Sequence, residues 1–527
     1  MFWADKLADE ITKAIPKTRK GGPFIIRDEK TPSGRVHVGS MRGVALHATL
    51  SEVLEERGKE NTFLYEFNDM DPMDGFPVYL PEEFRKYMGM PLMRIPSPDG
   101  KAKNFAEYFS NEFKEVIAHS GFSVSFYNVS ELYLSGKMDE AIRVALDNAS
   151  EVRRIYKEIS GSQKGSDWYP LSVICEKCGK VGTTEVYAWD GKEVSYRCKE
   201  DLVTWARGCG NEGKLVPFGG TAKFPFKVEW GAKWSVIGVD IEGAGKDHMT
   251  KGGAHDVAKA IAESVFKIEA PFDFAYEFFL VGGKKMSSSK GKGSSAKDIA
   301  ELVPPKIFRL ALLSKDIKQA FNFDPDGETI PTLYDLYDTT AEKFFSGEKD
   351  DFARLFELSH PKGVRKNIPN AYRPRFSIVS FIVQMPHLNF EEEVAKMKGS
   401  ALTAEDKAEA HEREEYARTW LTEHAPEKYR FELKQDGVPE VAKNLSELQK
   451  SALAEILQYI AVAPSLDGQK LHERLHALKD ELSIEPKELF SAIYLSFLGK
   501  ESGPKAGWFL SVLPKDFLIK RLQQVSS

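Results

Sequence analysis

The sequence contains little cysteine and no long apolar run. Four cysteines occur among its 527 residues, and no stretch reaches the roughly 18 apolar residues that a membrane-spanning helix needs. The first twenty residues, MFWADKLADEITKAIPKTRK, mix acidic and basic side chains with apolar ones and lack the apolar core of a secretory signal. These absences exclude membrane-spanning and secreted proteins, and they predict a cytoplasmic protein with no membrane partner.

A strong positive charge is also missing. The formal net charge of −6 argues against nonspecific coating of DNA, although a local basic surface could still bind RNA. One candidate is the stretch HPKGVRKNIPNAYRPR at residues 360–375, which carries five basic side chains and no acidic one. The stretch predicts either a surface for RNA phosphates or a solvated linker.

The few cysteines are concentrated in one block. Cys175 and Cys178 form a CxxC knuckle, and Cys198 and Cys209 follow. Four thiols so close in sequence predict a tetrahedral zinc site with four thiolate ligands. Because such a site leaves no open position for water, we expect a structural role. The alternative is two disulfides, which a reducing compartment disfavours.

The N-terminal half of the chain alternates between strand and helix signals. FIIRDE (24–29) and TFLYEF (62–67) predict strands on either side of a helix at 37–57, which is the βαβ unit of a parallel sheet. Helical patterns follow at 103–119 and 138–159, and the cysteine block contains the strand-like pieces TTEVYAW and EVSYRC. The alternation then resumes with a strand at 234–241, a helix at 253–268 and a strand at 274–281.

The C-terminal part of the chain is predicted to be helical, because segments such as SALAEILQYIAVA repeat apolar residues at i, i+3 and i+4. The predicted fold class is therefore α/β, with a parallel-sheet domain that carries a zinc-binding insertion and is followed by an all-helical domain. The predicted boundaries are 1–85 with 215–300 for the sheet domain, 86–214 for the insertion, 301–360 for a helical linking region and 361–527 for the helical domain.

The segment KTPSGRVHVGS, at residues 30–40, joins a predicted strand to a predicted helix. In a parallel sheet, ligands bind beyond the carboxyl ends of the strands, where helix N-termini attract anions. His37 could donate a hydrogen bond to a phosphate, and Gly39 would let a base or ribose approach the backbone. The alternative is a histidine that only caps the helix.

A second segment, KKMSSSKG at residues 284–291, also follows a predicted strand. Its lysines, hydroxyls and backbone amides could stabilise the charge that builds on a departing pyrophosphate. A solvated linker is the alternative for this segment alone. Both segments at strand ends, about 250 residues apart, favour an adenylate-forming site over coincidence.

These residues carry a family resemblance. TPSGRVHVGS resembles the HIGH signature of the class I aminoacyl-tRNA synthetases, and KMSSS resembles their KMSKS signature. Within that class, TPSGRVHVGS, NDMD with the following MGMP, and KVEWGAKWSVIGVDIEGAGKDH are similar to the class I lysyl-tRNA synthetases. The resemblance covers residues 20–300 well. It implies a Rossmann-type catalytic domain, a helical anticodon-binding domain, ATP and Mg²⁺ as cofactors, and lysine and tRNA(Lys) as partners.

The resemblance also implies site residues. His37 matches the first histidine of HIGH, and Ser40 stands where the second usually lies. Lys285 matches the first lysine of KMSKS, whereas the second is replaced by Ser288, with Lys290 nearby. His37, Lys285 and Lys290 are the expected catalytic residues, and no protein nucleophile is expected because catalysis would be positioning and electrostatics. The expected ATP-binding residues are Thr31, Ser33, His37, Gly39, Ser40, Gly238, Asp240, Lys285, Met286, Ser287 and Ser289.

Lysine has two ammonium groups and an apolar stem, so its site needs acidic or carbonyl-rich ends and aromatic walls. Trp230 and Tyr276 are the favoured aromatic residues, and both are expected near strand ends. His248 could add a hydrogen bond, or could simply cap a helix. Arg27 stands where related sequences carry an acid. The expected lysine-binding residues are Asp28, Asp69, Trp230, Glu242, His248 and Tyr276.

Several functions stay open on the sequence alone. The leading hypothesis is a lysine-tRNA ligase that forms lysyl-adenylate and transfers lysine to tRNA(Lys), with a monomer favoured. A synthetase for glutamate or cysteine is one alternative, but it would need an arginine or a zinc ion in the pocket. A paralogue that transfers the amino acid to a small molecule or protein has no use for an anticodon domain. A non-charging zinc-containing RNA-binding paralogue would not need His37, Gly39 or Lys285.

Overall fold

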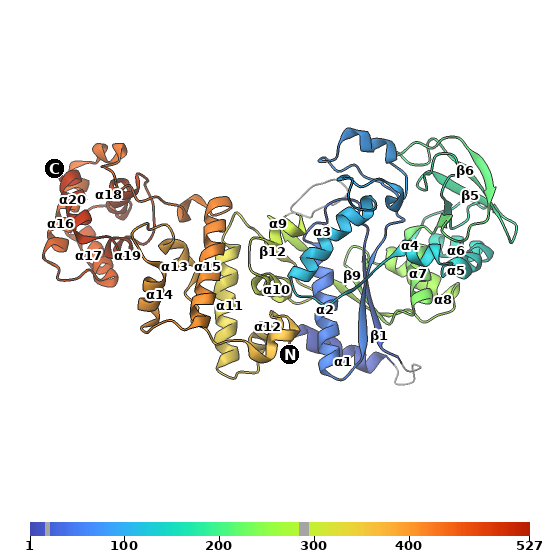
Figure 1. Cartoon of the computed structure of the whole chain (residues 1–527), viewed down its shortest axis with the longest axis horizontal. Helices are drawn as coiled ribbons and strands as arrows, with labels where there is room; N and C mark the ends of the chain where they lie inside the picture. The colour runs from blue at the N-terminus through green and yellow to red at the C-terminus, as the bar shows by residue number, and fades with distance from the viewer. Residues whose placement is uncertain (16–21, 284–294) are drawn as a thin grey trace. The chain divides into compact units, whose positions relative to one another are not determined.

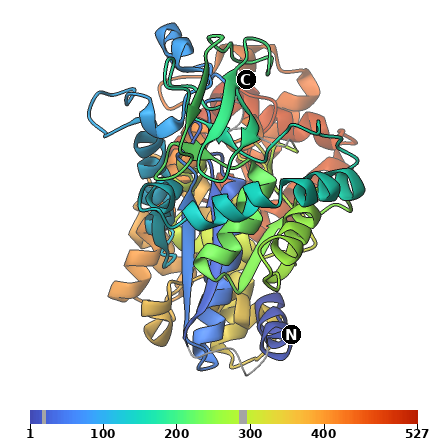
Figure 2. The ribbon, with the colours of Figure 1, turned by 90° about the vertical axis from the view of Figure 1, so that its right-hand side faces the viewer.

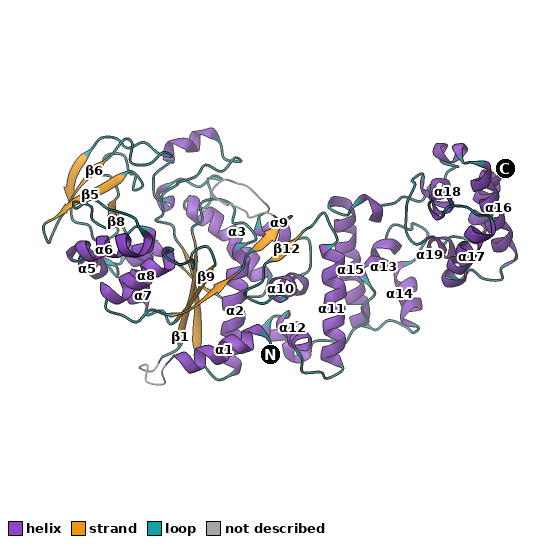
Figure 3. Ribbon diagram, turned by 180° about the vertical axis from the view of Figure 1, so that it is seen from behind, coloured by secondary structure: helices purple, strands orange, loops and turns teal. Residues whose placement is uncertain are grey.

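The computed structural model of the chain describes residues 1–15, 22–283 and 295–527 and divides into two compact units. Unit 1 comprises Met1–Asp324 and Thr339–Ile368, and unit 2 comprises Pro325–Asp338 and Pro369–Ser527. All strands of the described residues belong to unit 1 (Figure 3). Within the described residues, no helix combines the length and apolar character that crossing a membrane requires.

Unit 1 is built on a five-stranded parallel sheet of order β10-β9-β1-β2-β3. The chain runs from β1 outward to β2 and β3, and it returns to the other side of β1 with β9 and β10. The carboxyl ends of β1 and β9 therefore flank the point where the strand order reverses, which is where α/β sheets bind ligands. The strands are β1 (Phe24–Lys30), β2 (Asn61–Phe67), β3 (Ser125–Asn128), β9 (Ile241–Gly245) and β10 (Phe272–Tyr276).

Helices cover the sheet, as the parallel pairing requires. The long helix α2 (Ser40–Glu56), which α1 (Trp3–Ala14) contacts, packs on β1, β2 and β9. In Figure 2, α7 (Phe226–Ile237) and α8 (Ala254–Ser264), in light green, lie in front of the blue strands β1 and β2. Side chains alternate along a strand, so β1 sends Asp28 toward α2, where it lies beside Gly43, and Glu29 toward α7, where it pairs with Lys233.

The predicted strand at 234–241 is wrong. Residues 226–237 form the helix α7, which ends at Gly238 with a φ of 75°, and the strand of the sheet is β9, four residues further on. The helix lacks an apolar period because it is buried on several sides, including Trp230 and Trp234. The sequence of β9, IEGAG, has only a weak strand pattern. Gly243 has no room for a side chain, because the ring of Phe274 lies where that side chain would project.

Two further segments differ from the prediction. The edge strand β3 and the helix before it, α3 (Phe105–His119), belong to the main sheet layer, although they fall inside the range predicted as the insertion. The predicted strand at 274–281 is divided. Its first part ends β10, and its second part is β11 (Phe279–Val281), which pairs with β12 (Phe321–Phe323) in a separate two-stranded sheet.

The insertion carries short helices and small antiparallel sheets, visible near the upper right of Figure 1. Strands β5, β6 and β7 form one sheet around the cysteine block, and β4 pairs with β8. The bounds are η1 (Glu82–Tyr87), η2 (Leu92–Arg94), α4 (Val129–Leu134), α5 (Asp139–Asp147), α6 (Ala149–Ser160), β4 (Ser172–Val173), β5 (Thr184–Trp189), β6 (Val194–Cys198), β7 (Glu212–Leu215) and β8 (Ala222–Lys223).

The remaining elements are helical, apart from β12, which confirms the predicted helical C-terminal part. In unit 2, a core of buried Leu, Ile and Phe side chains joins the last five helices. The bounds are α9 (Ala296–Ala300), α10 (Pro305–Leu313), α11 (Thr329–Phe345), α12 (Asp351–Leu358), η3 (Lys362–Asn367), α13 (Phe376–Ile382), α14 (Phe390–Lys398), α15 (Ala404–Glu423), η4 (Glu427–Tyr429), η5 (Glu440–Asn444), α16 (Glu447–Val462), α17 (Gly468–Glu481), α18 (Pro486–Leu498), α19 (Ala506–Ser511) and α20 (Lys515–Ser526).

The basic stretch at 360–375 is largely neutralised by acidic partners. Arg365 is buried and pairs with Glu52 and with Glu56 of α2, the latter at 3.2 Å. In unit 2, Arg375 pairs with Asp335 at 2.7 Å. The buried Arg365 therefore stabilises the fold, whereas Arg375 is paired at the surface, and the role of the stretch as a surface for RNA phosphates stays a prediction.

Candidate active site at the carboxyl ends of the strands

A cavity of about 450 Å³ opens beyond the carboxyl ends of β1, β9 and β10, at the point where the strand order reverses. Its lining is polar and aromatic. Most of the site residues predicted from the sequence contribute to it, namely Asp28, Thr31, Ser33, His37, Gly39, Ser40, Trp230, Glu242, His248 and Tyr276.

The remaining predicted residues lie elsewhere. Asp69 and Gly238 do not line this cavity, and neither does Asp240, which sits at the amino end of the sheet where it accepts a hydrogen bond from the Ile25 amide at 2.8 Å. The prediction for Gly238 and Asp240 is wrong because it rests on a strand where the chain forms α7. The loop residues Lys285, Met286, Ser287, Ser289 and Lys290 fall outside the described residues.

The first wall of the cavity is the loop that leads from β1 into α2. Gly39 has no room for a side chain, since an ideal Cβ would stand 2.9 Å from Nδ1 of His37 and 3.2 Å from the carbonyl oxygen of Phe279. His37 forms an isolated bridge with Ser295, and the Ala296 amide donates to the Val36 carbonyl at 2.8 Å. The start of α2 and the start of α9 are thus fixed to each other, and the N-terminus of α2 adjoins the cavity, where it favours anionic groups.

Asp28 and Tyr276 form an acidic and aromatic corner above α2. Both lie against Gly43, where an ideal Cβ would stand 2.4 Å from Oδ2 of Asp28 and 2.6 Å from the Tyr276 hydroxyl oxygen. Burial raises the pKa of Asp28 well above its usual range, because only the Glu29 amide and the more distant Arg27 oppose the desolvation. A carboxylate in that state is stabilised by a cation that binds beside it.

Glu242 occupies the opposite face of the sheet and is held by internal donors. Arg27 donates to its Oε1 at 2.6 Å, Trp230 donates to the same oxygen at 3.1 Å, and Trp234 donates to Oε2 at 2.5 Å. Burial raises the pKa of Glu242 to about 7, although Arg27 opposes the shift. The arrangement fixes the indole of Trp230, whose ring also meets Phe226 and His248 at centroid distances of 5.3 and 6.0 Å.

Beneath the cavity lies a buried ionic network that the sequence analysis did not identify. Arg27 pairs with Glu66 at 2.9 Å and with Glu29 at 2.5 Å, and Lys233 pairs with Glu66 at 2.7 Å and contacts Glu29 as well. Buried charges persist only where they are paired, so the network fixes β1, β2 and α7 relative to one another. The charged residues within the predicted strands FIIRDE and TFLYEF were the feature of the sequence that could have indicated this network.

Two other polar residues are structural. Asp69 accepts hydrogen bonds from the Ser130 amide at 2.9 Å and the Ser130 hydroxyl at 2.6 Å, so it orients the first turn of α4. Burial raises the pKa of Asp69 to about 6, against these hydrogen bonds. His47 of α2 is buried between the Gly43 carbonyl and the Gly243 amide, each at 2.8 Å, and therefore ties α2 to β9.

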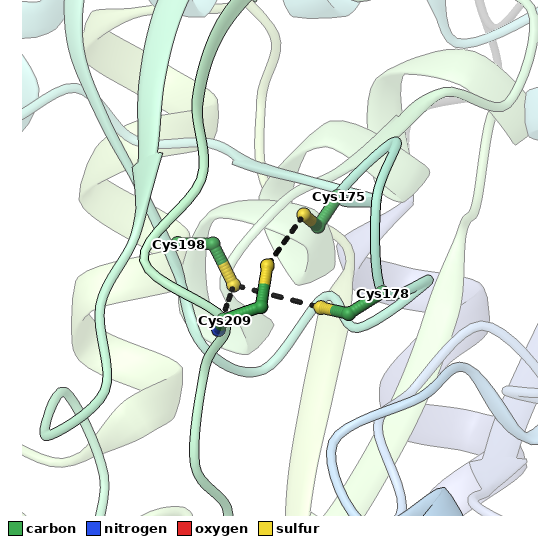
Figure 4. Close-up of side chains that lie close together, drawn as sticks. All are labelled: Cys175, Cys178, Cys198 and Cys209. Atoms are coloured by element: carbon green, nitrogen blue, oxygen red, sulfur yellow. Dashed lines mark hydrogen bonds between the residues drawn. The ribbon is translucent and has the colours of Figure 1, made fainter.

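The four cysteines come together in the insertion, with their sulfur atoms converging on one point (Figure 4). All four are free thiols whose sulfur atoms lie within 4.8 Å of one another, with Cys175 and Cys209 at 3.6 Å and Cys178 and Cys198 at 3.7 Å. Zinc–sulfur bonds of about 2.3 Å in a tetrahedron place sulfur atoms about 3.8 Å apart, whereas a disulfide needs about 2.05 Å. The geometry fits a four-thiolate metal site and does not fit two disulfides.

Comparison with known proteins identifies families that match both units of the chain. Residues 1–362 match the family model described as tRNA synthetases class I (K), and residues 421–526 match the one described as an anticodon binding domain. The chain is 33% identical to a lysine–tRNA ligase of Methanosarcina barkeri, with 100% of this chain and 98% of that protein covered.

A lysine–tRNA ligase of Methanocaldococcus jannaschii is 32% identical, with 99% of both chains covered. Among solved structures, the chain is similar to a glutamate tRNA ligase from Elizabethkingia meningosepticum in complex with its amino acid. That likeness has a TM-score of 0.42 and 14% sequence identity, and it covers 96% of this chain and 99% of the other.

Proposed function

This chain is a member of the class I lysyl-tRNA synthetase family, and from that membership we propose that it activates lysine with ATP to lysyl-adenylate and transfers the lysine to tRNA(Lys). The observation that carries the proposal is the full-length match to lysine–tRNA ligases together with a cavity that suits a cationic amino acid. Asp28, Glu29, Glu242 and Asp247 line the cavity, against Lys30 as the single lysine or arginine among the lining residues that the structure describes.

The triphosphate of ATP would bind at the loop between β1 and α2. The N-terminus of α2 and the ring of His37 would face the phosphates, the Ser33 hydroxyl could donate to them, and Gly39 would leave room for the nucleoside. The Thr31 hydroxyl already donates to Asp71, so Thr31 would line the site without donating. The lysine carboxylate attacks the α-phosphate and displaces pyrophosphate, so no protein nucleophile is needed. Catalysis would rest on positioning and on charge stabilisation, to which Lys285 and Lys290 would contribute.

The amino acid would bind between the Asp28 corner and Trp230. Asp28 and the Tyr276 hydroxyl could hold an ammonium group, and Trp230 and His248 would pack along the stem. Glu242 would act mainly by orienting Trp230, because its oxygens already accept hydrogen bonds from Arg27, Trp230 and Trp234. Asp69, which supports α4, would take part only indirectly.

The composition of the cavity also bears on the alternative substrates. A glutamate site would need a cation for the side-chain carboxylate, and no arginine occurs among the described lining residues, since Arg27 lies below and is paired with acids. A cysteine site would place a zinc ion at the substrate thiol, but the described lining contains no cysteine. Lysine remains the amino acid that the site suits best.

Two metal ions complete the proposal. The four thiols would hold a structural Zn²⁺, which stabilises the insertion when bound. Mg²⁺, which takes oxygen ligands, would be held mainly by the triphosphate, with the Asp247 carboxylate at the rim as a protein ligand, and would offset negative charge on the phosphates. The domain matched as anticodon-binding would read tRNA(Lys), and we expect a monomer.

The test is amino-acid-dependent exchange of pyrophosphate into ATP, run with each of the twenty amino acids, with and without tRNA. Lysine is expected to support exchange, and glutamate and cysteine are not. Exchange that depended on another amino acid, or no exchange with lysine in either condition, would refute the proposal.

A further inference from the structure

The proposed lysine cavity is rich in carboxylates, although lysine brings a carboxylate of its own. Asp28, Glu29, Glu242 and Asp247 contribute to the lining, and Lys30 is the one lysine or arginine in the lining that the structure describes. Because like charges repel at close range, such a surface suits a diamine better than an amino acid. The cavity therefore needs a further positive charge to admit lysine in preference to a diamine.

Arg27 supplies such a charge from beneath the cavity. Its side chain is fully buried and lies outside the lining. The guanidinium donates to Oε1 of Glu242 at 2.6 Å and to Oε2 of Glu29 at 2.5 Å, so it faces two of the lining carboxylates directly. Although burial opposes the charged form, Glu242 and Glu66 raise the pKa of Arg27 well above its usual value. Arg27 is therefore a permanent cation.

The rest of the ionic network holds the guanidinium in this position. Glu66 of β2 is fully buried and accepts hydrogen bonds from Arg27 at 2.9 Å and from Lys233 at 2.7 Å. The Tyr127 hydroxyl of β3 accepts from Arg27 at 3.0 Å and donates to Glu66 at 2.5 Å. Apolar side chains could fix the same elements without the cost of burying charges. Stability alone is therefore a weak reason for a network that touches the substrate cavity.

We propose that Arg27 is a specificity-determining residue whose charge lets the cavity accept the carboxylate of lysine, so that the amino acid is preferred over 1,5-diaminopentane. This diamine differs from lysine only in lacking the carboxylate, and the ratio of the two dissociation constants therefore isolates the contribution of that group. Arg27 acts through Glu29 and Glu242 without touching the substrate. The inference rests on the proposed function, because it takes lysine as the amino acid that the cavity binds.

The alternative is that Arg27 only maintains the fold. Its loss would then weaken the binding of lysine and of the diamine to the same extent, since both occupy one cavity, and the ratio of their dissociation constants would not change. The ratio is thus a readout that a purely structural role does not move.

The test measures both dissociation constants by calorimetric titration of the full-length protein at about pH 8.5, where Glu242 is ionised because its pKa is about 7. Arg27→Gln should lower the preference for lysine over the diamine about tenfold, since one unit charge several ångströms away in a protein interior changes binding by that order. Arg27→Lys keeps the charge and loses the forked geometry, so its preference should stay within about threefold of the wild type.

Glu66→Gln provides a test in the opposite direction. It removes a negative charge from the same network at a residue outside the cavity lining, so it should raise the preference for lysine about threefold to tenfold. The double variant Arg27→Gln/Glu66→Gln keeps the net charge of the network and should return toward the wild-type ratio. It also avoids leaving one partner of a buried pair alone. If Arg27→Gln does not fold, Glu66→Gln and the double variant decide.

The matched control is Arg309→Gln. Arg309 is also fully buried and pairs with Glu52 at 3.2 Å. Glu52 lies near the far end of α2, roughly 18 Å along the helix from Ser40, which lines the cavity. The loss of this arginine should lower stability and leave the ratio of the two dissociation constants unchanged.

Opposite shifts in Arg27→Gln and Glu66→Gln would support the proposal. An unchanged ratio in Glu66→Gln, shifts of the same sign in both variants, or an equal shift in Arg309→Gln would overturn it. Exchange with lysine by the wild type tests the proposed function separately, since a protein that exchanges with lysine but shows no dependence of the ratio on these charges keeps that function. A wild type that neither binds lysine nor exchanges with it would overturn both.

Discussion

At the scale of single residues, the alternation of side chains along β1 decides which acid can meet the substrate. Arg27 and Glu29 face α7 and belong to the buried ionic network, whereas Asp28 faces α2 and the cavity. Of these two acids, Glu29 is held by two cations, and its pKa is lowered by Lys233 and Arg27 in spite of burial. Asp28 is the acid whose charge a bound ammonium would stabilise most.

We therefore expect Asp28→Asn to raise the Michaelis constant for lysine about tenfold to a hundredfold, since a buried hydrogen bond to a charged group is worth about 1.5–3 kcal/mol. The constant for ATP should change little. Asp273→Asn, on strand β10 of the same sheet and outside the cavity lining, is the control and should behave like the wild type. Steady-state exchange kinetics measure both constants, and an unchanged constant for lysine would remove Asp28 from the site.

A second prediction concerns His47. Burial lowers its pKa to about 4, below the value of about 6.5 expected when unfolded, because the charged form loses its hydration and the Gly243 amide already donates to Nε2. The unfolded state therefore binds more protons between these values. The neutral histidine's contribution to stability is complete above about pH 7 and is lost as the pH falls from about 6.5 to 4.

The expected loss is about 3 kcal/mol of the free energy of unfolding, from a pKa difference of roughly two and a half units. Denaturant titrations from pH 4 to 8 measure it as the difference between the wild type and His47→Gln, which cannot titrate there. His119→Gln, at the exposed end of α3, is the control and should keep the wild-type slope. Parallel pH profiles for the wild type and His47→Gln would contradict the assignment.

The sequence correctly brings Thr31, Ser33, His37, Gly39 and Ser40 to the cavity, because they lie within one ten-residue segment that is flanked by clear strand and helix signals. The sequence does not predict that Glu242 orients the indole of Trp230, since their hydrogen bond depends on α7 packing across β9. The sequence pattern also misplaces Gly238 and Asp240. The residues directly before them resemble a strand in sequence, but they form the end of the helix α7.

At the scale of secondary-structure elements, burial on several sides hides the helical period of α7. The strand β9 is short and contains two glycines, and pairing with β1 and β10 and packing against α2 stabilise it. Such elements are specified by tertiary packing more than by local propensity. The long helix α2 and the strands β1 and β2, by contrast, are evident from their apolar patterns.

The cysteine block gives a prediction at this scale. Purified protein should contain about one zinc per chain, and Cys178→Ser should release the metal and lower the melting temperature of the insertion, because three thiolates bind zinc more weakly than four. Lys177→Ala, in the same knuckle but without a ligand atom in the cluster, is the control and should keep its zinc. Elemental analysis checks the metal, and metal-free wild-type protein or a mapped disulfide would refute the site.

At the scale of the whole molecule, the two units hold different features. Unit 1 holds the cavity beyond the strand ends and the cysteine cluster, while the match to an anticodon-binding domain falls within unit 2. The sequence predicted a helical C-terminal part, but it could not show that arginines in 360–375 are paired with acids, because their partners lie far away in the sequence.

Truncation after Ile368 tests this division. The shortened protein should keep lysine-dependent exchange, measured with tRNA present and absent, and should show a Michaelis constant for tRNA(Lys) raised by a factor of at least about ten, because the contacts to the anticodon are lost. Full-length protein assayed with tRNA(Lys) of altered anticodon should show a similar defect. A truncated protein that charged tRNA(Lys) normally would show that unit 2 does not read the anticodon.

The attachment of lysine to tRNA(Lys) is measured most directly by a charging assay with purified protein, total tRNA, ATP and Mg²⁺. Each of the twenty amino acids is supplied labelled in a separate reaction, and the acylated tRNA is identified by hybridisation. We expect that lysine alone becomes ester-linked and that the label resides on tRNA(Lys). Label from another amino acid, or lysine on a different tRNA, would contradict it.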